Sequence, residues 1–348
     1  PKTPLHRPEP IIRHSARPVD LNTPPAWAAA RLREGELLLV TDRYSTGAEI
    51  LAVLAAELGE PDPDASHDER RAHKRAARAV AMRLLAPIEK HRLALSGGRP
   101  NGLLSELYPG QPRFFLPFAQ VQELHGAWER YQNGVAVSVL GYRLHPYYGV
   151  YAPNRTEHLE LFATWLSQYG GARRRAVDVG TGSGVLALML CRAGFGSVLA
   201  TDINPNAIES VARQRERLPE PPPIELLHGD LFGTDRSAAD LIVFNPPWQQ
   251  GKVEGLLDSA LIFEEGLFER FFDQALLRLS PAGRIVLVFS TVLQLSRPDL
   301  PHPILAELER GRLRLVQKLN RKVRPSPTPA GQPRKTREQV EVWELARA

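Results

Sequence analysis

The chain has 348 residues, ten histidines, one cysteine and a formal net charge of +5. This length accommodates one large domain and a smaller one, and a hydrophobic content of 43% supplies a full apolar core. The single cysteine, Cys191, excludes an intrachain disulfide, and no apolar run is long enough to span a membrane. We therefore expect a cytoplasmic protein without a membrane partner, and the scattered histidines predict no metal site.

The first third of the chain predicts a separate, smaller domain. Residues 1–24, rich in Pro and Arg, predict an extended arm. A mostly helical domain is expected over 25–132, and substrate recognition is the role we expect for it. Its predicted elements are helices at 26–32, 48–58, 68–95 and 117–131, a strand at 36–40 and a linker at 61–66.

The helix predicted at 68–95 carries four basic residues at helical spacing. Arg71, Lys74, Arg75 and Arg78 follow one another at i, i+3, i+4 and i+7, which places them on one face. Such a face is typical of a solvated surface helix, and a contact with RNA, DNA or the ribosome is the alternative.

A connector over 133–157 separates this domain from the rest. Val135, Val137 and Val139 alternate with other residues, and this alternation predicts a β-hairpin between 134 and 151. The hairpin is followed by Pro153-Asn154-Arg155-Thr156-Glu157. The remaining residues, 158–348, are expected to form the larger domain.

A glycine-rich turn follows a short apolar strand at 176–179. The strand contains Asp178, and the turn reads Gly180-Thr181-Gly182-Ser183-Gly184 before an apolar helix that runs to 193. Glycines let the backbone pass close to a ligand, and turn amides at a helix N-terminus carry positive partial charge. The turn therefore predicts a site for the carboxylate or phosphate of a small molecule.

The next strands end in polar residues. A strand at 197–202 ends at Asp202, one at 224–230 ends at Asp230, and one at 241–244 leads into Asn245-Pro246-Pro247-Trp248. An acid at the end of the second strand can accept both hydroxyls of a ribose. Prolines fix the backbone around Asn245, so two acceptor oxygens and an aromatic ring are presented to a planar NH2 group.

The pattern continues as alternating helices and strands. We expect a loop at 249–255, a helix from 256 or 261 to 279, a strand at 284–289, a helix at 304–309, and strands at 312–319 and 339–345. A basic loop at 318–337 lies between the last two strands. One interpretation of this loop is solvated surface charge, and the other is a contact with RNA or DNA. Its cations are Lys318, Arg321, Lys322, Arg324, Arg334, Lys335 and Arg337.

The glycine turn, the acids and Asn-Pro-Pro-Trp together resemble the class I S-adenosylmethionine (SAM) methyltransferases. The final motif resembles the enzymes that methylate amide or exocyclic amino nitrogens. The hairpin, followed by Thr156-Glu157 and the turn, is similar to the release-factor glutamine N5-methyltransferases and the small methyltransferase-domain family. The resemblance implies an α/β fold with a seven-stranded Rossmann-like sheet whose last strand is antiparallel, and SAM as cofactor.

The resemblance also implies residue roles. The methionine end of SAM would lie against Gly180, Thr181, Gly182 and Gly184, with Asp178 orienting the turn. The ribose would meet Asp202 and Ile203, and the adenine would meet Asp230 and Leu231. The catalytic group would be Asn245, Pro246, Pro247 and Trp248, and Asn245 would also contact SAM. Substrate would be bound by Arg155, Thr156 and Trp248.

From the sequence we expect this chemistry to work by positioning and electrostatics, without a dedicated general base. The leading expectation is SAM-dependent methylation of a glutamine-type side chain on a protein. The first alternative is an adenine or guanine amino group in RNA or DNA. A small metabolite of a biosynthetic pathway and a catalytically silent partner subunit are the others.

Overall fold

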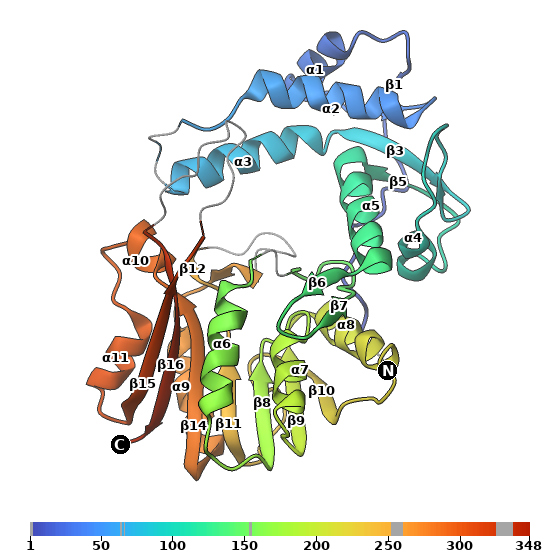
Figure 1. Cartoon of the computed structure of the whole chain (residues 1–348). Helices are drawn as coiled ribbons and strands as arrows, with labels where there is room; N and C mark the ends of the chain where they lie inside the picture. The colour runs from blue at the N-terminus through green and yellow to red at the C-terminus, as the bar shows by residue number, and fades with distance from the viewer. Residues whose placement is uncertain (1–2, 63–64, 66, 153–154, 252–259, 325–336) are drawn as a thin grey trace. The chain divides into compact units, whose positions relative to one another are not determined.

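The computed structural model describes residues 3–62, 65, 67–152, 155–251, 260–324 and 337–348. The chain divides into two compact units (Figure 1). The N-terminal unit comprises residues 7–129. The C-terminal unit comprises residues 130–348 together with the residues that precede Arg7.

The N-terminal unit contains a five-stranded sheet, where a mostly helical domain was expected. The strands are β1 Arg17–Val19, β2 Leu38–Val40, β3 Leu84–Glu89, β4 Arg92–Leu93 and β5 Arg113–Pro117, in the order β1-β2-β3-β4 with β5 also paired to β3. The helices are α1 Pro25–Arg33, α2 Tyr44–Leu58, α3 His67–Ala81, α4 Gly102–Leu107 and α5 Phe118–Asn133.

The single helix predicted over 68–95 is wrong. Helix α3 ends at Ala81, and β3 and β4 occupy the rest of that range. Pro87 lies inside β3 and would remove a hydrogen bond from any helix that continued through it. Leu84 and Leu85 are fully buried, and β3 pairs with β2 and β5 through them. These contacts with distant strands favour a strand here, and local periodicity does not reveal them.

The arm predicted over 1–24 is also incorporated into this unit from residue 7 onward. Strand β1 pairs in parallel with β2. Ile11 and Phe115 exchange two backbone hydrogen bonds, at 2.9 and 2.8 Å. The physical reason is that an isolated extended segment satisfies its backbone groups on a sheet edge.

The C-terminal unit contains a seven-stranded sheet. Its strands are β8 Arg175–Val179, β9 Ser197–Asp202, β10 Ile224–His228, β11 Ala239–Phe244, β14 Leu279–Ser290, β15 Leu313–Lys322 and β16 Gln339–Arg347, in the order β10-β9-β8-β11-β14-β16-β15. Strand β16 runs antiparallel to both of its neighbours, and β8 to β11 and β14 are parallel. The predicted Rossmann-like sheet with an antiparallel last strand is confirmed.

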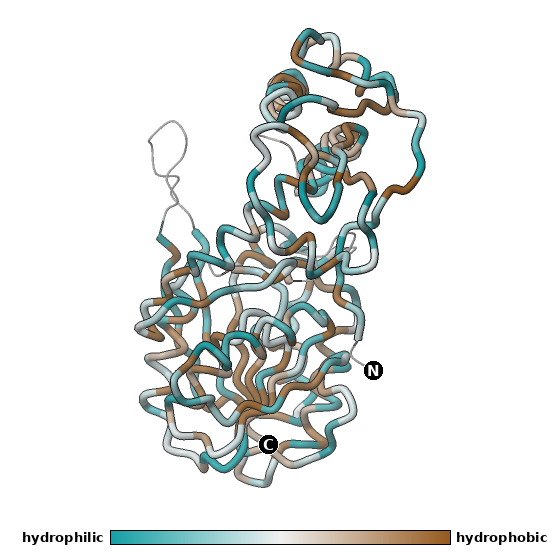
Figure 2. The backbone as a smooth tube through the Cα atoms, turned by 90° about the vertical axis from the view of Figure 1, so that its right-hand side faces the viewer, coloured by the Kyte–Doolittle hydropathy of each residue, from teal (hydrophilic) through white to brown (hydrophobic). Residues whose placement is uncertain are grey.

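Successive side chains of each strand point to opposite faces of the sheet and pack into two apolar layers. In β11, Leu241 and Val243 pack with helices α6 Glu157–Gln168, α7 Val185–Arg192 and α8 Pro205–Glu216. Ile242 and Phe244 face the other way, toward α9 Leu267–Arg278 and α11 Pro303–Glu309. Figure 2 shows the apolar strands gathered inside this unit.

Shorter elements flank the sheet. Strands β6 Val135–Val137 and β7 Tyr142–Leu144 form a hairpin within the range 134–151, with its second strand earlier than the 147–151 expected, and β12 Gln249–Gln250 pairs with β13 Ile262–Phe263. The helix expected from 256 or 261 begins only at Leu267, after Gly266 with a φ of +82°. Helix α10, Val292–Ser296, was not expected. Residues 252–255 of the expected loop, 256–259 at the start of the expected helix and 325–336 of the basic loop lie outside the described residues.

Candidate active site

The parallel strands bring distant residues to one edge of the sheet. Because β8, β9, β10 and β11 are adjacent and point the same way, their carboxyl ends meet, which is where ligands bind in open α/β sheets. A cavity of about 420 Å³ lies there, within the range of about 300–1,000 Å³ typical of small-molecule sites. Nine of the residues expected at the site line it: Gly180, Thr181, Gly182, Asp202, Ile203, Asp230, Leu231, Asn245 and Pro247.

The glycine turn adopts a backbone that other residues resist. Gly180, Gly182 and Gly184 have φ values of +65°, +53° and +81°. No heavy atom lies within 4 Å of the Cβ position at Gly182, so the backbone there is open to a ligand. A Cβ at Gly184 would lie 2.8 Å from a methyl carbon of Val211, so this glycine is required for packing of the turn on α8.

Asp178 supports the turn from below. Its Oδ2 accepts a hydrogen bond from the Thr181 hydroxyl at 2.7 Å and one from the backbone N–H of Ala187 at 3.0 Å. Burial raises the pKa of Asp178 to about 7, and the two hydrogen bonds act in the opposite direction. Asp178 is not part of the cavity wall, so its contacts hold the turn and the start of α7 together.

Asp202 joins two loops. Its Oδ2 accepts from the backbone N–H of Gly182 at 2.8 Å, and its Oδ1 accepts from the N–H of Asn204 at 2.8 Å. Burial raises the pKa of this carboxyl, against these two hydrogen bonds. A carboxylate has about four lone-pair sites, so acceptor capacity remains on the cavity side for hydroxyl groups.

The part of the cavity wall formed by Ile203 and Asp230 is more exposed to solvent. Ile203 is 58% exposed although it is a large apolar residue, and an exposed apolar surface in a cavity suits a flat ring. Asp230 lies 3.8 Å from the Arg270 guanidinium. Leu231 has a φ of +49°, which turns the backbone after β10 toward the cavity.

The side-chain oxygen of Asn245 has no partner. Its Oδ1 is buried and forms no hydrogen bond with any residue that the structure describes. Buried amide oxygens are usually hydrogen-bonded, because leaving one unpaired costs about 1–3 kcal/mol. The orphan acceptor lies in the cavity wall at the end of β11, so a ligand donor would satisfy it.

Some residues expected at the site are not part of the cavity wall. Trp248 donates its indole Nε1–H to the Val288 carbonyl at 3.3 Å and packs in both apolar layers. Arg155 pairs with Glu338 at 3.1 Å, and the Thr156 hydroxyl donates to Glu160 at 3.0 Å. Gly184 and Pro246 are also outside the lining, the latter buried beside Asn245.

The cavity also contains residues that the sequence did not single out. They are Tyr151, His158, Phe263, Glu264 and Arg270. His158 directly follows the Thr156-Glu157 pair, which was the available signal for it. Phe263, Glu264 and Arg270 depend on how β13 and α9 return to the sheet, and no local pattern marks them.

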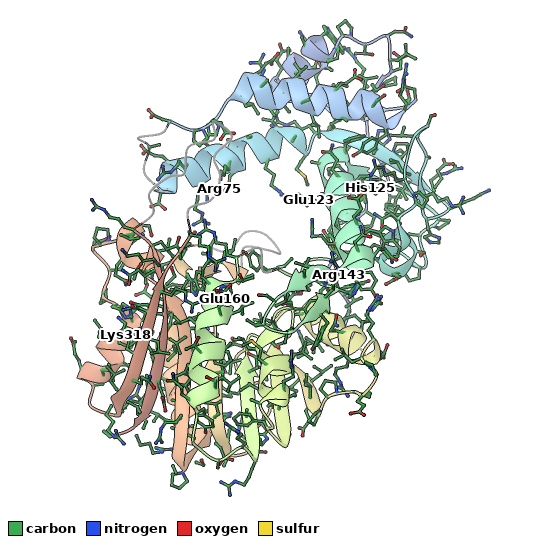
Figure 3. The ribbon with its side chains drawn as sticks, viewed as in Figure 1. Arg75, Glu123, His125, Arg143, Glu160 and Lys318 are labelled. Atoms are coloured by element: carbon green, nitrogen blue, oxygen red, sulfur yellow. The ribbon has the colours of Figure 1, made fainter. Side chains whose placement is uncertain are left out.

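Three cations of the basic loop region form ion pairs within the C-terminal unit. Lys318 on β15 lies 2.8 Å from Glu341 and 3.9 Å from the centre of the Trp343 ring (Figure 3). Arg321 and Arg324 both pair with Glu160 of α6, at 2.7 and 3.2 Å. These three charges therefore fasten β15 to its neighbours.

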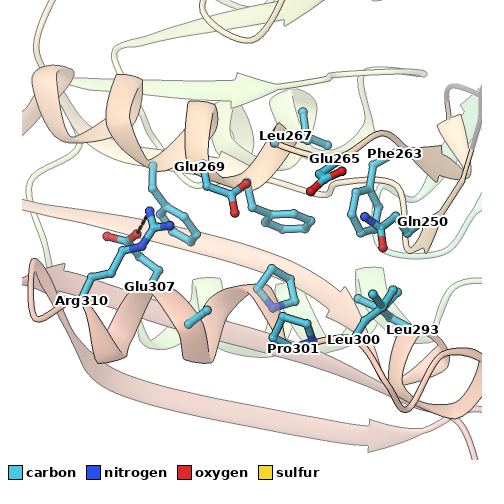
Figure 4. A pocket seen from close by; sticks show the side chains of 15 residues that line it. Gln250, Phe263, Glu265, Leu267, Glu269, Leu293, Leu300, Pro301, Glu307 and Arg310 are labelled. Carbon is cyan, nitrogen blue, oxygen red and sulfur yellow. Dashed lines mark ion pairs between the residues drawn. The ribbon is translucent and has the colours of Figure 1, made fainter.

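A second, smaller cavity lies between α9 and α11. Its volume is about 190 Å³, and its wall includes Phe263, Leu267 and Pro301 (Figure 4). At one end Glu307 and Arg310 form an ion pair at 3.6 Å. It shares Phe263 and Leu267 with the larger cavity and contains none of the residues expected at the site.

The described part of the chain carries neither a membrane-spanning helix nor a cluster of metal ligands. No helix there is both long and apolar enough to cross a membrane. Nor do three or more His, Cys, Asp or Glu side chains of the described residues gather as metal ligands would.

The sheet order, glycine turn and strand-end acids define a Rossmann-like methyltransferase fold. Residues 142–305 match the family model described as "Methyltransferase small domain". The match covers 164 of the 348 residues, and this segment is similar to a methyltransferase small domain.

Relatives with curated names are methyltransferases of RNA or protein. "Ribosomal RNA small subunit methyltransferase C" of Chromohalobacter salexigens is 30% identical over 176 residues, 49% of this chain and 47% of the relative. "tRNA1(Val) (adenine(37)-N6)-methyltransferase" of Aeromonas salmonicida is 32% identical over 126 residues, 34% of this chain and 53% of the relative. "Ribosomal protein L11 methyltransferase" of Pelotomaculum thermopropionicum is 43% identical over 68 residues, 20% of this chain and 22% of the relative.

The chain thus spans about half, or less, of the length of these relatives. Among solved structures, the ribosomal protein L11 methylase of Lactobacillus delbrueckii subsp. bulgaricus is similar with a TM-score of 0.40 and 19% identity, over 57% of this chain and 81% of that chain.

Proposed function

We propose that this protein transfers the methyl group of SAM to a planar NH2 nitrogen, and that the nitrogen is the exocyclic amino group of a base in RNA. The first part rests on Asn245 in the cavity wall, whose buried Oδ1 has no hydrogen-bond partner among the described residues. An amino group that donates to this oxygen would satisfy it. Asp178 and the glycine turn lie on the adjacent strand β8.

The cavity residues fit SAM. The open backbone at Gly182 and the turn amides suit the methionine carboxylate. Asp202 retains acceptor capacity for the ribose hydroxyls, and the exposed Ile203 beside Leu231 offers apolar surface to the adenine. When bound, SAM supplies an activated methyl group on a sulfonium centre.

The protein's contribution is then positioning. The lone pair of an amide or aryl amine is delocalised, so the nitrogen is a poor nucleophile. Acceptors on the two hydrogens, Asn245 Oδ1 and the Pro246 carbonyl, would favour the geometry in which the lone pair points at the methyl carbon. Alignment of this kind lowers barriers by roughly 7–11 kcal/mol.

The names of two relatives support RNA as the acceptor. The rRNA and tRNA methyltransferases align over 176 and 126 residues, and the tRNA enzyme is named for adenine N6, an exocyclic amino nitrogen. The L11 relative aligns over 68 residues. A glutamine-type amide presents the same NH2 group, and it remains the alternative because the L11 relative is named for a protein substrate.

The test is methyl transfer from labelled SAM into a lysate separated into RNA, DNA, protein and small molecules, with the Asn245→Ala variant as control. We expect label in RNA that disappears with the variant, and nucleoside analysis to place it on an exocyclic nitrogen. Label in protein would favour the glutamine alternative, and label in DNA or in small molecules would replace RNA by that acceptor class. No label in any fraction would overturn the proposal in favour of a silent subunit.

A further inference from the structure

A buried histidine lies in the wall of the larger cavity. His158 is the second residue of α6 and is only 8% exposed. It lines the cavity together with Asn245 and Pro247, the residues next to which the target nitrogen is proposed to bind. The fold thus brings one of the ten histidines to the reaction site.

The His158 ring is held by an aromatic contact. It meets the Trp248 ring nearly at a right angle, with 5.4 Å between centroids and an interplanar angle of 88°. Trp248 in turn donates to the Val288 carbonyl of β14. The first turn of α6 is anchored because the Glu157 carboxylate accepts the backbone N–H of Arg324 at 3.1 Å. The ring position is therefore set by Trp248, three residues after Asn245.

The ring nitrogens remain available to a substrate. No hydrogen bond among the described residues involves the His158 side chain, although the ring is at the cavity surface. Burial lowers the pKa of His158 to about 4, against the opposing effect of the Glu157 charge. At neutral pH the imidazole is uncharged and presents one N–H donor and one nitrogen lone pair.

The proposed reaction leaves a proton to be removed. The nitrogen lone pair forms the new N–C bond while the C–S bond breaks and its electron pair stays on sulfur. The positive charge thereby moves to the nitrogen, which carries the methyl group and both hydrogens until one leaves as a proton. Amide oxygens such as that of Asn245 accept hydrogen bonds but are too weakly basic to take this proton.

The other ionisable groups of the cavity wall already have polar partners or are exposed to solvent. Asp202 accepts two backbone N–H groups, and Asp230 lies beside Arg270. Tyr151 and Glu264 are exposed at the cavity. His158 is the buried, neutral base among these described groups.

We propose that His158 hydrogen-bonds the target amino group and accepts the proton which this nitrogen releases on methylation. The inference rests on the function proposed above. A positively charged, methylated base or amide nitrogen is a much stronger acid than an imidazolium, so even a weakly basic histidine takes its proton. The imidazolium then gives the proton to water, and the neutral ring is restored.

The test compares His158→Asn with the matched variant His302→Asn. His302 also packs edge-on against an aromatic ring, that of Phe289 at 5.3 Å and 70°, but it is not part of the cavity wall. We expect His158→Asn to lower kcat about 10²-fold, the low end of what a positioned general base contributes, with SAM affinity by calorimetry unchanged. His302→Asn should retain kcat.

A second readout does not depend on turnover. In a complex with S-adenosylhomocysteine and the acceptor RNA, the ring resonances of His158, identified by their loss in His158→Asn, should shift on RNA binding, and those of His302 should not. Unshifted His158 resonances would overturn the proposed contact.

Ring rescue separates base chemistry from packing. Added imidazole should restore methyl transfer by His158→Ala, and thiophene, a ring of the same size without an acceptor nitrogen, should not. Equal rescue by both, or wild-type kcat in His158→Asn, would overturn the inference alone. A wild-type protein that methylates no fraction overturns the proposed function, and this inference with it.

Discussion

The carboxylate of Asp202 accepts a hydrogen bond from the backbone N–H of Gly182 at 2.8 Å, so the end of β9 and the glycine turn after β8 hold each other in place. The other carboxylate oxygen accepts from Asn204, which caps α8. One buried side chain thus fixes two of the loops that form the larger cavity.

Asp202→Asn should weaken SAM binding about 10- to 100-fold, because the amide retains one acceptor oxygen for two backbone N–H groups and hydrogen bonds to a charged group contribute about 1.5–3 kcal/mol. Titration calorimetry measures this directly. The control is Asp240→Asn, because Asp240 is also buried but lies at the opposite end of the sheet, where it pairs with Arg174 at 2.6 Å. Unchanged affinity in Asp202→Asn would contradict the assigned role.

Alanine at the two glycines of the turn should have different effects. Gly184→Ala combines a left-handed backbone with a clash against Val211, so we expect a loss of about 2–5 kcal/mol in the free energy of unfolding. Gly182→Ala has open space around its Cβ and should cost only about 1–2 kcal/mol, while its methyl group enters the cavity. Chemical denaturation reports the first effect and SAM calorimetry the second. Equal losses of unfolding free energy in the two variants would mean that the contact with Val211 does not add to the cost of Gly184→Ala.

The stability of the protein should depend on the ionisation of Asp178. Its folded pKa is about 7 and its ordinary value is 3.8, so the folded state binds the proton more tightly. This contribution to stability is complete below about pH 3.8 and is lost as the pH rises through about 7. Asp178→Asn, which keeps an acceptor oxygen for Thr181, should therefore gain stability relative to the wild type between these pH values. If the free energy of unfolding changed with pH in the same way for both proteins across pH 4–8, the raised pKa of Asp178 would be refuted.

Asn245→Ala should lower the rate of methyl transfer by about 10²- to 10³-fold, the effect of removing one positioned polar group from an active site. SAM binding should be mostly retained, since the glycine turn, Asp202 and Ile203 carry most of the contacts proposed for SAM. The matched control is Asn320→Ala on the exposed face of β15, which should behave as wild type. An active Asn245→Ala variant would remove the basis of the proposed function.

The two basic groups should differ in the salt dependence of RNA binding. Helix α3 has no buried side chain among those described, and Lys74 is exposed on it. Changing Lys74 to Gln should reduce the slope of log K against log salt by about 1. Changing Lys318 and Arg321 to Gln should leave the slope unaltered, because their charges pair with Glu341 and Glu160. Fluorescence anisotropy on the labelled RNA fraction measures both, and equal slopes would exclude α3 as an RNA contact.

The seven-stranded sheet was predictable from the sequence because its strands are short apolar runs that end in polar residues. The strand expected at 197–202 coincides with β9, and that at 241–244 lies within β11. A parallel buried strand needs an apolar side chain on both faces, so the pattern is continuous and visible locally. The sheet of the N-terminal unit was not predictable, because β1 and β3 are stabilised by strands far away in the sequence.

The candidate site, like the fold, was predictable only where it depends on local sequence. The sequence alone determined which residues stand at the carboxyl ends of β8, β9, β10 and β11, since strand periodicity and glycine or proline punctuation are local properties. Only the tertiary structure decided that Asn245 Oδ1 is left without a partner, that Trp248 supports the wall from behind, and that His158 joins the cavity. Those outcomes depend on how α6 and β14 pack against the strand ends, and packing between distant segments is set by shape and burial that no local pattern encodes.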